Sequence, residues 1–365
     1  MILSKLKLSD FRNFENLNLD FSENINIIYG KNGSGKTNLV ESIYMLALTK
    51  SFRSILDKKI IRKGAKELTI EGTILTNIKT YYKITINEKN KLVEIDNNKK
   101  NKLSEYVSNI NVILFNPDDT RIVKDSPSER RKLLNIELSK IYKEYLLLLT
   151  SYNKILKHRN MYLKELAING NASKEYLDIL TRKLIEIGYQ IYEYRDIFIE
   201  DISKYIGNIY KSIFGYGELV VNYNSNYNNK DVKQIFDLYR DNYSREIKLG
   251  TTIFGIHKDD IHFLLDGNLI KEWGSTGQQK NTIISFKLAE LTYLKEEKNK
   301  TPILILDDLF SELDKEKVDN ILKTLQKDVQ IFITTTSIKN LKLKKFSNYK
   351  IFKIENNQVE EIENE

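Results

Sequence analysis

A phosphate-binding loop near the N-terminus constrains this chain more than any other feature. It has the pattern G-x-x-x-x-G-K-[ST] and consists of Gly30, Lys31, Asn32, Gly33, Ser34, Gly35, Lys36 and Thr37. The apolar, β-branched run 25–29 predicts a strand before it, and the apolar spacing of 38–48 predicts a helix after it. In that context, backbone N–H groups and the helix N-terminus bind phosphate. We therefore expect ATP, with Lys36 at the β- and γ-phosphates and the Thr37 hydroxyl on Mg²⁺; the alternative is a glycine-rich turn that binds nothing.

An acidic pair ends a second apolar run. Residues 302–306 are apolar, as is typical of a strand buried on both faces of a parallel sheet, and Asp307 and Asp308 follow directly. The carboxyl ends of such strands form the edge at which ligands bind. We expect Asp307 to hold Mg²⁺ and Asp308 to orient and deprotonate the attacking water. Two surface carboxylates without a function are the alternative.

A second candidate anion site begins at Ser275. This residue precedes a predicted helix over 277–293. Its hydroxyl can cap that helix, and the free backbone N–H groups of the first turn can bind an anion. The phosphate loop and this helix start can face one γ-phosphate only if a second copy of the chain supplies one of them.

The order of these elements resembles the ABC-type ATPases: phosphate loop, signature helix, acidic strand, then a Ser-x-Leu-Asp loop at 311–314. The resemblance implies that Ser275, Gly277 and Gln278 contact the γ-phosphate of the opposite protomer. Transporter ATPases carry a His after the next strand, whereas the run 330–337 here has none. A Thr hydroxyl cannot act as a charged switch near neutral pH, so the resemblance implies slow hydrolysis.

Further motifs resemble the RecF family of bacterial recombination and repair ATPases. They follow the family's order over almost the whole chain, at 6–14, 49–53, 115–119, 126–131, 255–260 and 306–314. Two positions depart from the family pattern, with Ile256 in place of Pro and Leu177 in place of Trp. The first departure leaves the role of His257 open.

Composition limits the class of protein. The chain has 365 residues and no cysteine, which excludes disulfides and thiolate metal sites and is typical of a reducing cytoplasm. It has no apolar run of transmembrane length, so we expect a cytoplasmic protein without a membrane partner.

The net charge of +8 favours a polyanion partner. Residues 121–160 hold ten cations against four acids (Arg121, Lys124, Arg130, Arg131, Lys132, Lys140, Lys143, Lys154, Lys157 and Arg159 against Asp125, Glu129, Glu137 and Glu144). We expect DNA contact there; a solvated helix face, or a composition bias that spreads Lys through the whole chain, is the alternative.

The predicted fold is α/β: an ABC-type ATPase head, with a mixed sheet, flanking helices and an antiparallel β subdomain, and an inserted compact helical arm. We assign 1–125 to the first lobe of the head, 126–250 to the arm and 251–365 to the rest of the head. Apolar periodicity predicts arm helices over 127–166 and 173–214 with a turn at 169–173, and only 237 residues separate Thr37 from Ser275, too few for a long coiled coil.

Within the head, strands at 68–75, 80–87, 91–95 and 112–115 should form the antiparallel meander, with a further hairpin at 264–269. Tyr142, Tyr145, Tyr152 and Tyr162 could stack on bases, but their helical spacing favours packing.

The resemblance implies an ATP-dependent DNA-binding protein of recombinational repair and replication. It would form an ATP-driven homodimer on gapped or junction DNA without base specificity, support recombinase loading with RecO and RecR, and hydrolyse ATP slowly and in a DNA-stimulated way. Two alternatives stay open: the ATPase subunit of an ABC transporter, and a nucleotide-gated DNA-binding module with negligible hydrolysis.

Overall fold

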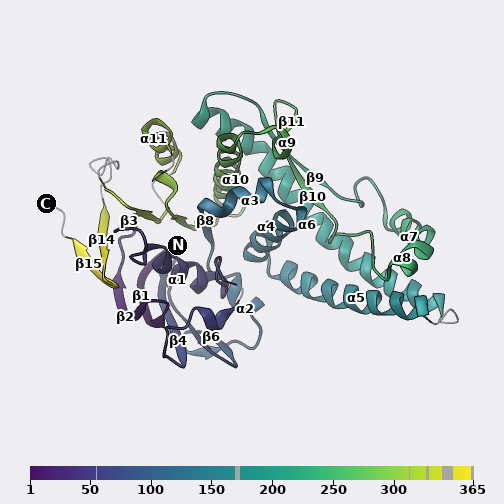
Figure 1. Ribbon diagram of the computed structural model, residues 1–365, viewed down its shortest axis with the longest axis horizontal. Helices are drawn as coiled ribbons and strands as arrows, with labels where there is room; N and C mark the ends of the chain where they lie inside the picture. Colours follow the sequence, from purple (N-terminus) through teal and green to yellow (C-terminus); the bar gives the residue numbers. More distant parts are fainter. Residues whose placement is uncertain (55, 169–172, 312, 326–328, 339–347, 363–365) are drawn as a thin grey trace. The chain divides into compact units, whose positions relative to one another are not determined.

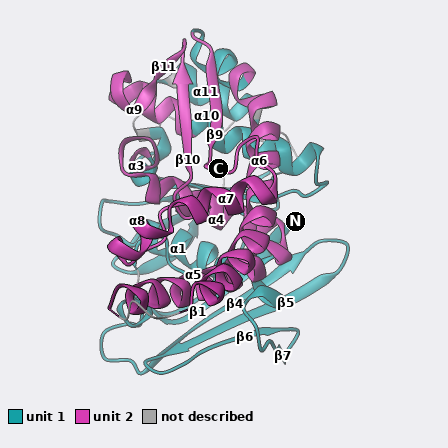
Figure 2. Ribbon diagram, turned by 90° about the vertical axis from the view of Figure 1, so that its right-hand side faces the viewer, with its two compact units in different colours: residues 1–119, 209–216, 284–365 teal, residues 120–208, 217–283 magenta. Residues whose placement is uncertain are grey.

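The computed structural model describes residues 1–54, 56–168, 173–311, 313–325, 329–338 and 348–362. They form two compact units (Figure 2). Unit 1 contains Met1–Asp119, Ile209–Tyr216 and Ile284–Glu365, and unit 2 contains Thr120–Asn208 and Gly217–Ile283. Each unit is described by itself.

Unit 1 contains a mixed sheet with the strand order β15-β14-β3-β13-β12-β8 among the described residues (Figure 1). All neighbours are parallel except β14 and β15. The bounds are β3 Ile25–Tyr29, β8 Val112–Phe115, β12 Ile303–Leu306, β13 Ile331–Thr335, β14 Tyr349–Glu355 and β15 Gln358–Ile362. Every residue of β8, β12 and β13 is buried, as expected for parallel strands covered on both faces. The predicted strands before the phosphate loop and the acidic pair are confirmed.

The second sheet of unit 1 is antiparallel, in the order β2-β1-β4-β5-β6-β7. The bounds are β1 Ile2–Phe11, β2 Phe14–Asp20, β4 Glu67–Leu75, β5 Lys79–Asn87, β6 Lys91–Ile95 and β7 Asn98–Lys99. The predicted meander is correct for its first three strands. It is wrong for 112–115, because this run is β8 and pairs in parallel with β12 in the mixed sheet. Its four consecutive buried apolar residues fit a two-sided parallel environment, whereas β4 and β5 alternate buried and half-exposed positions.

Helix α1 (Lys36–Leu48) lies between the two sheets and contacts strands of both. This explains why nearly all of its residues are buried. The buried amide of Gln330 also links the sheets, since it exchanges two hydrogen bonds with the backbone of Leu3 at 2.8 and 2.9 Å. Further described helical segments that lie wholly in unit 1 are α2 Ser104–Val107, α11 Lys315–Thr324 and 3₁₀ turns at Asp57–Lys59, Pro117–Asp119 and Leu309–Ser311.

Unit 2 is mainly helical, with α3 Thr120–Lys124, α4 Pro127–Ile141, α5 Lys143–Ile168, α7 Val232–Asp241, α8 Tyr243–Leu249 and α9 Ile270–Trp273. Helices α6 (Lys174–Phe214) and α10 (Thr276–Glu296) contribute residues to both units. The predicted helix over 127–166 is two helices, because Tyr142 is extended between α4 and α5. Residues 169–172 of the predicted turn lie outside the described residues.

A three-stranded sheet in unit 2 has the order β11-β10-β9, with bounds β9 Leu219–Asn224, β10 Asp260–Leu265 and β11 Asn268–Leu269. The predicted hairpin at 264–269 is confirmed. The hairpin lies in unit 2, where β10 pairs with β9, a strand the sequence analysis missed; its expected place in the head stays a prediction. The unit boundaries at 119/120 and 283/284 differ from the domain bounds predicted at 125 and 250, which stay a prediction.

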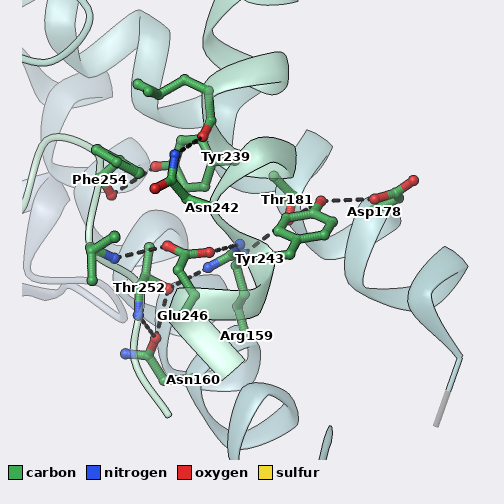
Figure 3. A network of polar contacts seen from close by, with 12 residues as sticks. Arg159, Asn160, Asp178, Thr181, Tyr239, Asn242, Tyr243, Glu246, Thr252 and Phe254 are labelled. Carbon is green, nitrogen blue, oxygen red and sulfur yellow. Dashed lines mark hydrogen bonds and ion pairs between the residues drawn. The ribbon is translucent and has the colours of Figure 1, made fainter. Parts of the chain in front are cut away.

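Buried polar groups hold the helices of unit 2 together. Figure 3 shows Arg159 of α5 bonded to Glu246 of α8, Thr181 of α6 and Thr252, at 2.5, 2.9 and 2.8 Å. On the same helix, α5, Tyr145 and Tyr152 are fully buried. For these two tyrosines the predicted packing role is confirmed.

None of the described helices combines the length and the apolar character that crossing a membrane requires.

Candidate functional site

The phosphate loop leaves β3 and opens α1, as its sequence predicts. Gly33 and Gly35 have φ of +80° and +109°, a region that side chains rarely adopt. A Cβ on Gly35 would lie 2.6 Å from Asn13 Nδ2, and one on Gly30 would lie 2.4 Å from the Ile354 carbonyl oxygen. The glycines therefore let the loop backbone approach its neighbours closely enough to curl around a phosphate.

Lys36 lies inside this loop. It is 7% exposed, and its Nζ donates to the carbonyl oxygens of Gly30 at 2.7 Å and Lys31 at 3.0 Å. Burial lowers the pKa of Lys36, while the nearby Asp308 and Asp307 oppose that shift. The chain thus holds a partly desolvated cation at the position where phosphate oxygens would replace two carbonyl partners.

The strand order brings Asp307 to the loop. β13 lies between β3 and β12, so Thr37, Thr334 and Asp307 meet at one edge of the sheet. Asp307 Oδ1 accepts from Thr334 Oγ1 at 2.7 Å and from Thr37 Oγ1 at 3.2 Å. Burial raises the pKa of Asp307, and both threonine hydrogen bonds oppose the rise.

Thr334 also positions Asp308. The Asp308 N–H donates to Thr334 Oγ1 at 2.9 Å, and Asp308 has a left-handed backbone with φ of +50°. Thr334 thus bonds to both members of the acidic pair. The sequence analysis noted only that the run 330–337, which contains this threonine, has no His; the contact of Thr334 with Asp307 follows from strand register, which the sequence does not show.

These residues fit a magnesium nucleotide. The Ser34 Oγ is buried and has no hydrogen-bond partner among the described residues, as expected for a group that serves a ligand. A Thr hydroxyl beside one buried carboxylate is the protein contribution that Mg²⁺ uses when phosphates and water complete its shell. Thr37 and Asp307 would hold the ion, and the loop from Gly30 to Thr37 would hold the phosphates. The bound ion would neutralise phosphate charge.

Two of the N-terminal motifs meet beside this loop. Glu41 of α1 is fully buried and accepts two hydrogen bonds from Arg12, at 2.7 and 3.0 Å, and one from Ser51 at 2.5 Å. Arg53 donates to Asn38 Oδ1 at 2.8 Å. The motifs at 6–14 and 49–53 therefore fix the first turns of α1, a role that sequence analysis did not assign.

Ser275 caps the helix predicted after it. Its Oγ accepts from the Gln278 N–H at 3.2 Å, and the Gln278 side chain accepts from the Ser275 N–H at 2.8 Å, which forms a capping box. Ser275, Gly277 and Gln278 belong to unit 2, whereas the phosphate loop and the acidic pair belong to unit 1. The structure thus assembles the predicted site residues in two groups. In the predicted 311–314 loop, Glu312 lies outside the described residues, and Asp314 caps α11 through the Lys317 N–H.

The His257 ring is hydrogen-bonded at both nitrogens inside unit 2. Its Nδ1 lies 2.8 Å from the Tyr152 hydroxyl and its Nε2 lies 3.2 Å from the Thr252 carbonyl oxygen. The carbonyl requires a proton on Nε2, so Tyr152 donates to Nδ1 of a neutral ring. Burial, followed by the nearby cations Lys258, Arg131 and Arg159, lowers the pKa of His257 to about 4, although the hydrogen bond to the Thr252 carbonyl opposes this shift.

This shift predicts acid sensitivity. The folded-state pKa is about 4 against 6.5 for the free side chain, so the unfolded chain binds the proton first and stability falls as pH drops through this window. We expect protonation of His257 to lower the free energy of unfolding by about 2 kcal/mol when the pH falls from 7 to 5. Replacing His257 with Gln should remove that part of the pH dependence in urea unfolding. The same change at the exposed His158 should not; equal slopes for both variants would contradict the assignment.

Some of the cations in the basic segment 121–160 form buried ion pairs within the protein. Arg130, Lys140 and Arg159 are buried, and each pairs with a carboxylate: Asp260, Glu137 and Glu246, respectively. The excess of cations over 121–160 therefore overstates the positive surface available to DNA.

Comparisons with known proteins agree with this arrangement. Residues 2–360 match the RecF/RecN/SMC N terminal domain. The chain is 37% identical to the DNA replication and repair protein RecF of Ligilactobacillus salivarius (strain UCC118), over 99% of this chain and 98% of that protein. It is 36% identical to RecF of Bacillus velezensis, over 98% and 99% of the two chains. The solved structure of the recombination mediator protein RecF-ATP in the RecFOR pathway is 28% identical, with a TM-score of 0.91, over 99% of this chain and 98% of that one.

The predicted fold class, an ABC-type ATPase head with an inserted helical arm, is confirmed by these matches. With the phosphate loop and the acidic strand end in one unit, and with relatives matched along their full length, the chain belongs to the RecF family of ABC/SMC-type ATPases.

Proposed function

We propose that this chain is a cytoplasmic, ATP-dependent DNA-binding protein of recombinational repair and replication. The observation that carries the proposal is the convergence of Thr37 and Thr334 on Asp307, next to a loop that encloses Lys36. Such a site binds a magnesium nucleotide rather than a generic anion, because it supplies a hydroxyl and a carboxylate for the ion as well as donors for phosphate.

The nucleotide is shared between two copies in this proposal. Lys36, Thr37, Asp307 and Asp308 serve the ATP of their own chain, while Ser275, Gly277 and Gln278 contact the γ-phosphate held by the partner. The capping box supports this role, since it fixes a long helix with its N-terminal backbone donors at an exposed residue. ATP then favours the dimer, and hydrolysis at Asp308 releases it.

DNA is the polyanion that the dimer would hold. The α5 residues Lys154, Lys157 and Lys164 are exposed on a helix of a chain with net charge +8. Contacts of this kind neutralise phosphates without reading bases, so binding should weaken steeply with salt. The names of the relatives support a role in DNA repair within a RecFOR pathway. In this proposal the DNA is gapped or has a junction, and RecO and RecR are the partners in recombinase loading.

The decisive experiment tests ATP-driven dimerisation. Sedimentation velocity should show monomers without nucleotide and with ADP, and dimers with ATP. Replacing Ser275 with Arg places a bulky cation at the proposed interface, so the ATP-bound dimer should be lost while ATP affinity stays within about twofold of wild type. Fluorescent-ATP titration measures that affinity.

Each outcome has a stated meaning. A dimer that is indifferent to nucleotide would contradict the shared site. Copurification with an integral membrane partner would instead favour the transporter alternative. ATP turnover that stays undetectable with gapped DNA would favour the nucleotide-gated binding module.

A further inference from the structure

One buried guanidinium joins two elements of unit 2 that lead to the signature serine. The Arg130 side chain is 3% exposed and forms a two-pronged ion pair with Asp260, with Nε–Oδ1 at 2.5 Å and Nη2–Oδ2 at 3.0 Å. Arg130 comes from α4, and Asp260 is the first residue of β10. These residues belong to the motifs at 126–131 and 255–260, whose roles the proposed function does not explain. The structure shows that the two motifs bind one another.

The third nitrogen of Arg130 holds the end of α3. Nη1 donates to the carbonyl oxygens of Ile122, Val123 and Asp125 at 2.9, 3.3 and 2.9 Å. Carbonyls in the last turn of a helix lack partners within the helix, so a buried cation there is favourable. Arg130 therefore fastens α3 and the start of β10 at the same time, which a shorter or single-pronged cation could not do.

Both fastened elements support α9. β10 continues through the turn at Asp266 and β11 directly into α9, and α3 also contacts α9. A cavity of about 210 Å³ lies among them, lined by residues that include Val123, Arg130, Leu269 and Lys271. α9 ends at Trp273, only two residues before Ser275.

The link from α9 to Ser275 is short and constrained. The Gly274 N–H donates to the Ile270 carbonyl oxygen at 2.9 Å. A Cβ at Gly274 would lie 2.6 Å from that same oxygen, so the backbone passes close against α9. The orientation of α9 therefore determines where the Ser275 cap and the first turn of α10 point.

We infer that Arg130 is a positioning residue for the signature helix: its pairing with Asp260 and α3 sets Ser275 in the geometry that a second copy's γ-phosphate requires. The inference rests on the proposed function, since Ser275 needs this precision only if it serves a partner's nucleotide. It assigns the motifs at 126–131 and 255–260 to the assembly of the composite site rather than to DNA or nucleotide contact.

The test uses two variants and a matched control in the full chain. Asp260→Asn breaks the ion pair with little change in volume, and Arg130→Met removes both links. Lys132→Met is the control, because Lys132 is exposed and makes a surface pair with Glu129 at 3.8 Å. The single tryptophan of the chain, Trp273, is 77% exposed and reports directly on α9.

We expect the dissociation constant of the ATP-bound dimer, measured by sedimentation, to rise about tenfold or more in both variants. ATP affinity should stay within about twofold, because the phosphate loop is untouched. At temperatures well below the melting temperature, the fluorescence anisotropy of Trp273 should be lower in both variants than in wild type. A loss of global stability alone would not lower it in the folded protein. The Lys132→Met protein should match wild type in all three measurements.

The failures are distinguishable. If wild type forms no ATP-dependent dimer, the proposed function falls and the inference falls with it. If wild type dimerises and Asp260→Asn dimerises equally well with unchanged Trp273 anisotropy, the inference alone is wrong. Should Arg130→Met fail to fold, Asp260→Asn decides the question.

Discussion

Replacing Lys36 with Met is expected to weaken ATP binding about a hundredfold or more. The ammonium is buried in the loop, and its Nζ already makes hydrogen bonds of 2.7 and 3.0 Å to Gly30 and Lys31 carbonyls that phosphate oxygens would replace. Charge-assisted hydrogen bonds contribute about 1.5–3 kcal/mol each, so two lost bonds correspond to at least that factor in affinity. Calorimetric titration with ATP and Mg²⁺ measures the change.

Two companion variants separate binding from chemistry. Lys31→Met keeps the backbone carbonyl that contacts Lys36 and removes only an exposed charge, so ATP affinity should change less than about threefold. Asp308→Asn should leave binding intact and lower turnover by about a hundredfold, as expected for loss of a general base. If Lys36→Met binds ATP normally, or if Asp308→Asn turns ATP over at the wild-type rate, the assignment of the site is wrong.

The parts of this site that sequence predicts correctly are local ones. The phosphate loop carries its own glycines, its strand and its helix within about 25 residues, and the structure places all three as predicted. The same holds for Ser275, where a Ser followed three residues later by Gln encodes the capping box directly. In such segments the residues that determine the geometry are neighbours in the chain.

What sequence misses depends on pairing between distant strands. An apolar run such as 112–115 fits either sheet of unit 1, and only its parallel partner β12 places it in the mixed sheet. Thr334 joins Asp307 and Asp308 because β13 lies beside β12, a neighbour relation that no local pattern encodes. The residues that we propose to bind the nucleotide could therefore be selected from sequence, whereas Thr334, which contacts the acidic pair, could not.

The number of cations in 121–160 does not predict the DNA-binding surface, because pairing with distant residues decides which cations are exposed. Arg130, Lys140 and Arg159 read as candidate DNA contacts while their partners are unknown. In the fold, Asp260 and Glu246 come from segments 130 and 87 residues away and pair with two of these cations, Arg130 and Arg159, which are both buried. Net charge over a window describes surface potential only after the internal ion pairs have been subtracted.

The deepest of these pairs predicts the largest loss of stability. Glu246→Gln should lower the free energy of unfolding of unit 2 by about 3–5 kcal/mol, because it leaves Arg159 as an uncompensated charge with both side chains 0% exposed. The Arg159 bonds to Thr181 and Thr252 supply neutral acceptors only and cannot replace the carboxylate (Figure 3). The Gln side chain of the variant can still accept from the Ile253 N–H. The loss of stability therefore measures removal of the carboxylate charge and not removal of this backbone contact. Urea unfolding followed by circular dichroism, which reports the loss of the helices of unit 2, measures it.

A matched Glu→Gln change at the surface provides the control. Glu129 pairs with Lys132 at 3.8 Å, both side chains are exposed, and such pairs contribute about 0–1 kcal/mol, so Glu129→Gln should shift the urea midpoint only slightly. The double variant Arg159→Met with Glu246→Met should be less destabilised than Glu246→Gln alone, because removing both charges removes the desolvation penalty. If Glu246→Gln costs no more than Glu129→Gln, the Arg159 network does not stabilise unit 2. If the double variant is the least stable protein, the bonds of Arg159 to Thr181 and Thr252, rather than its pairing with Glu246, hold α5 to its neighbours.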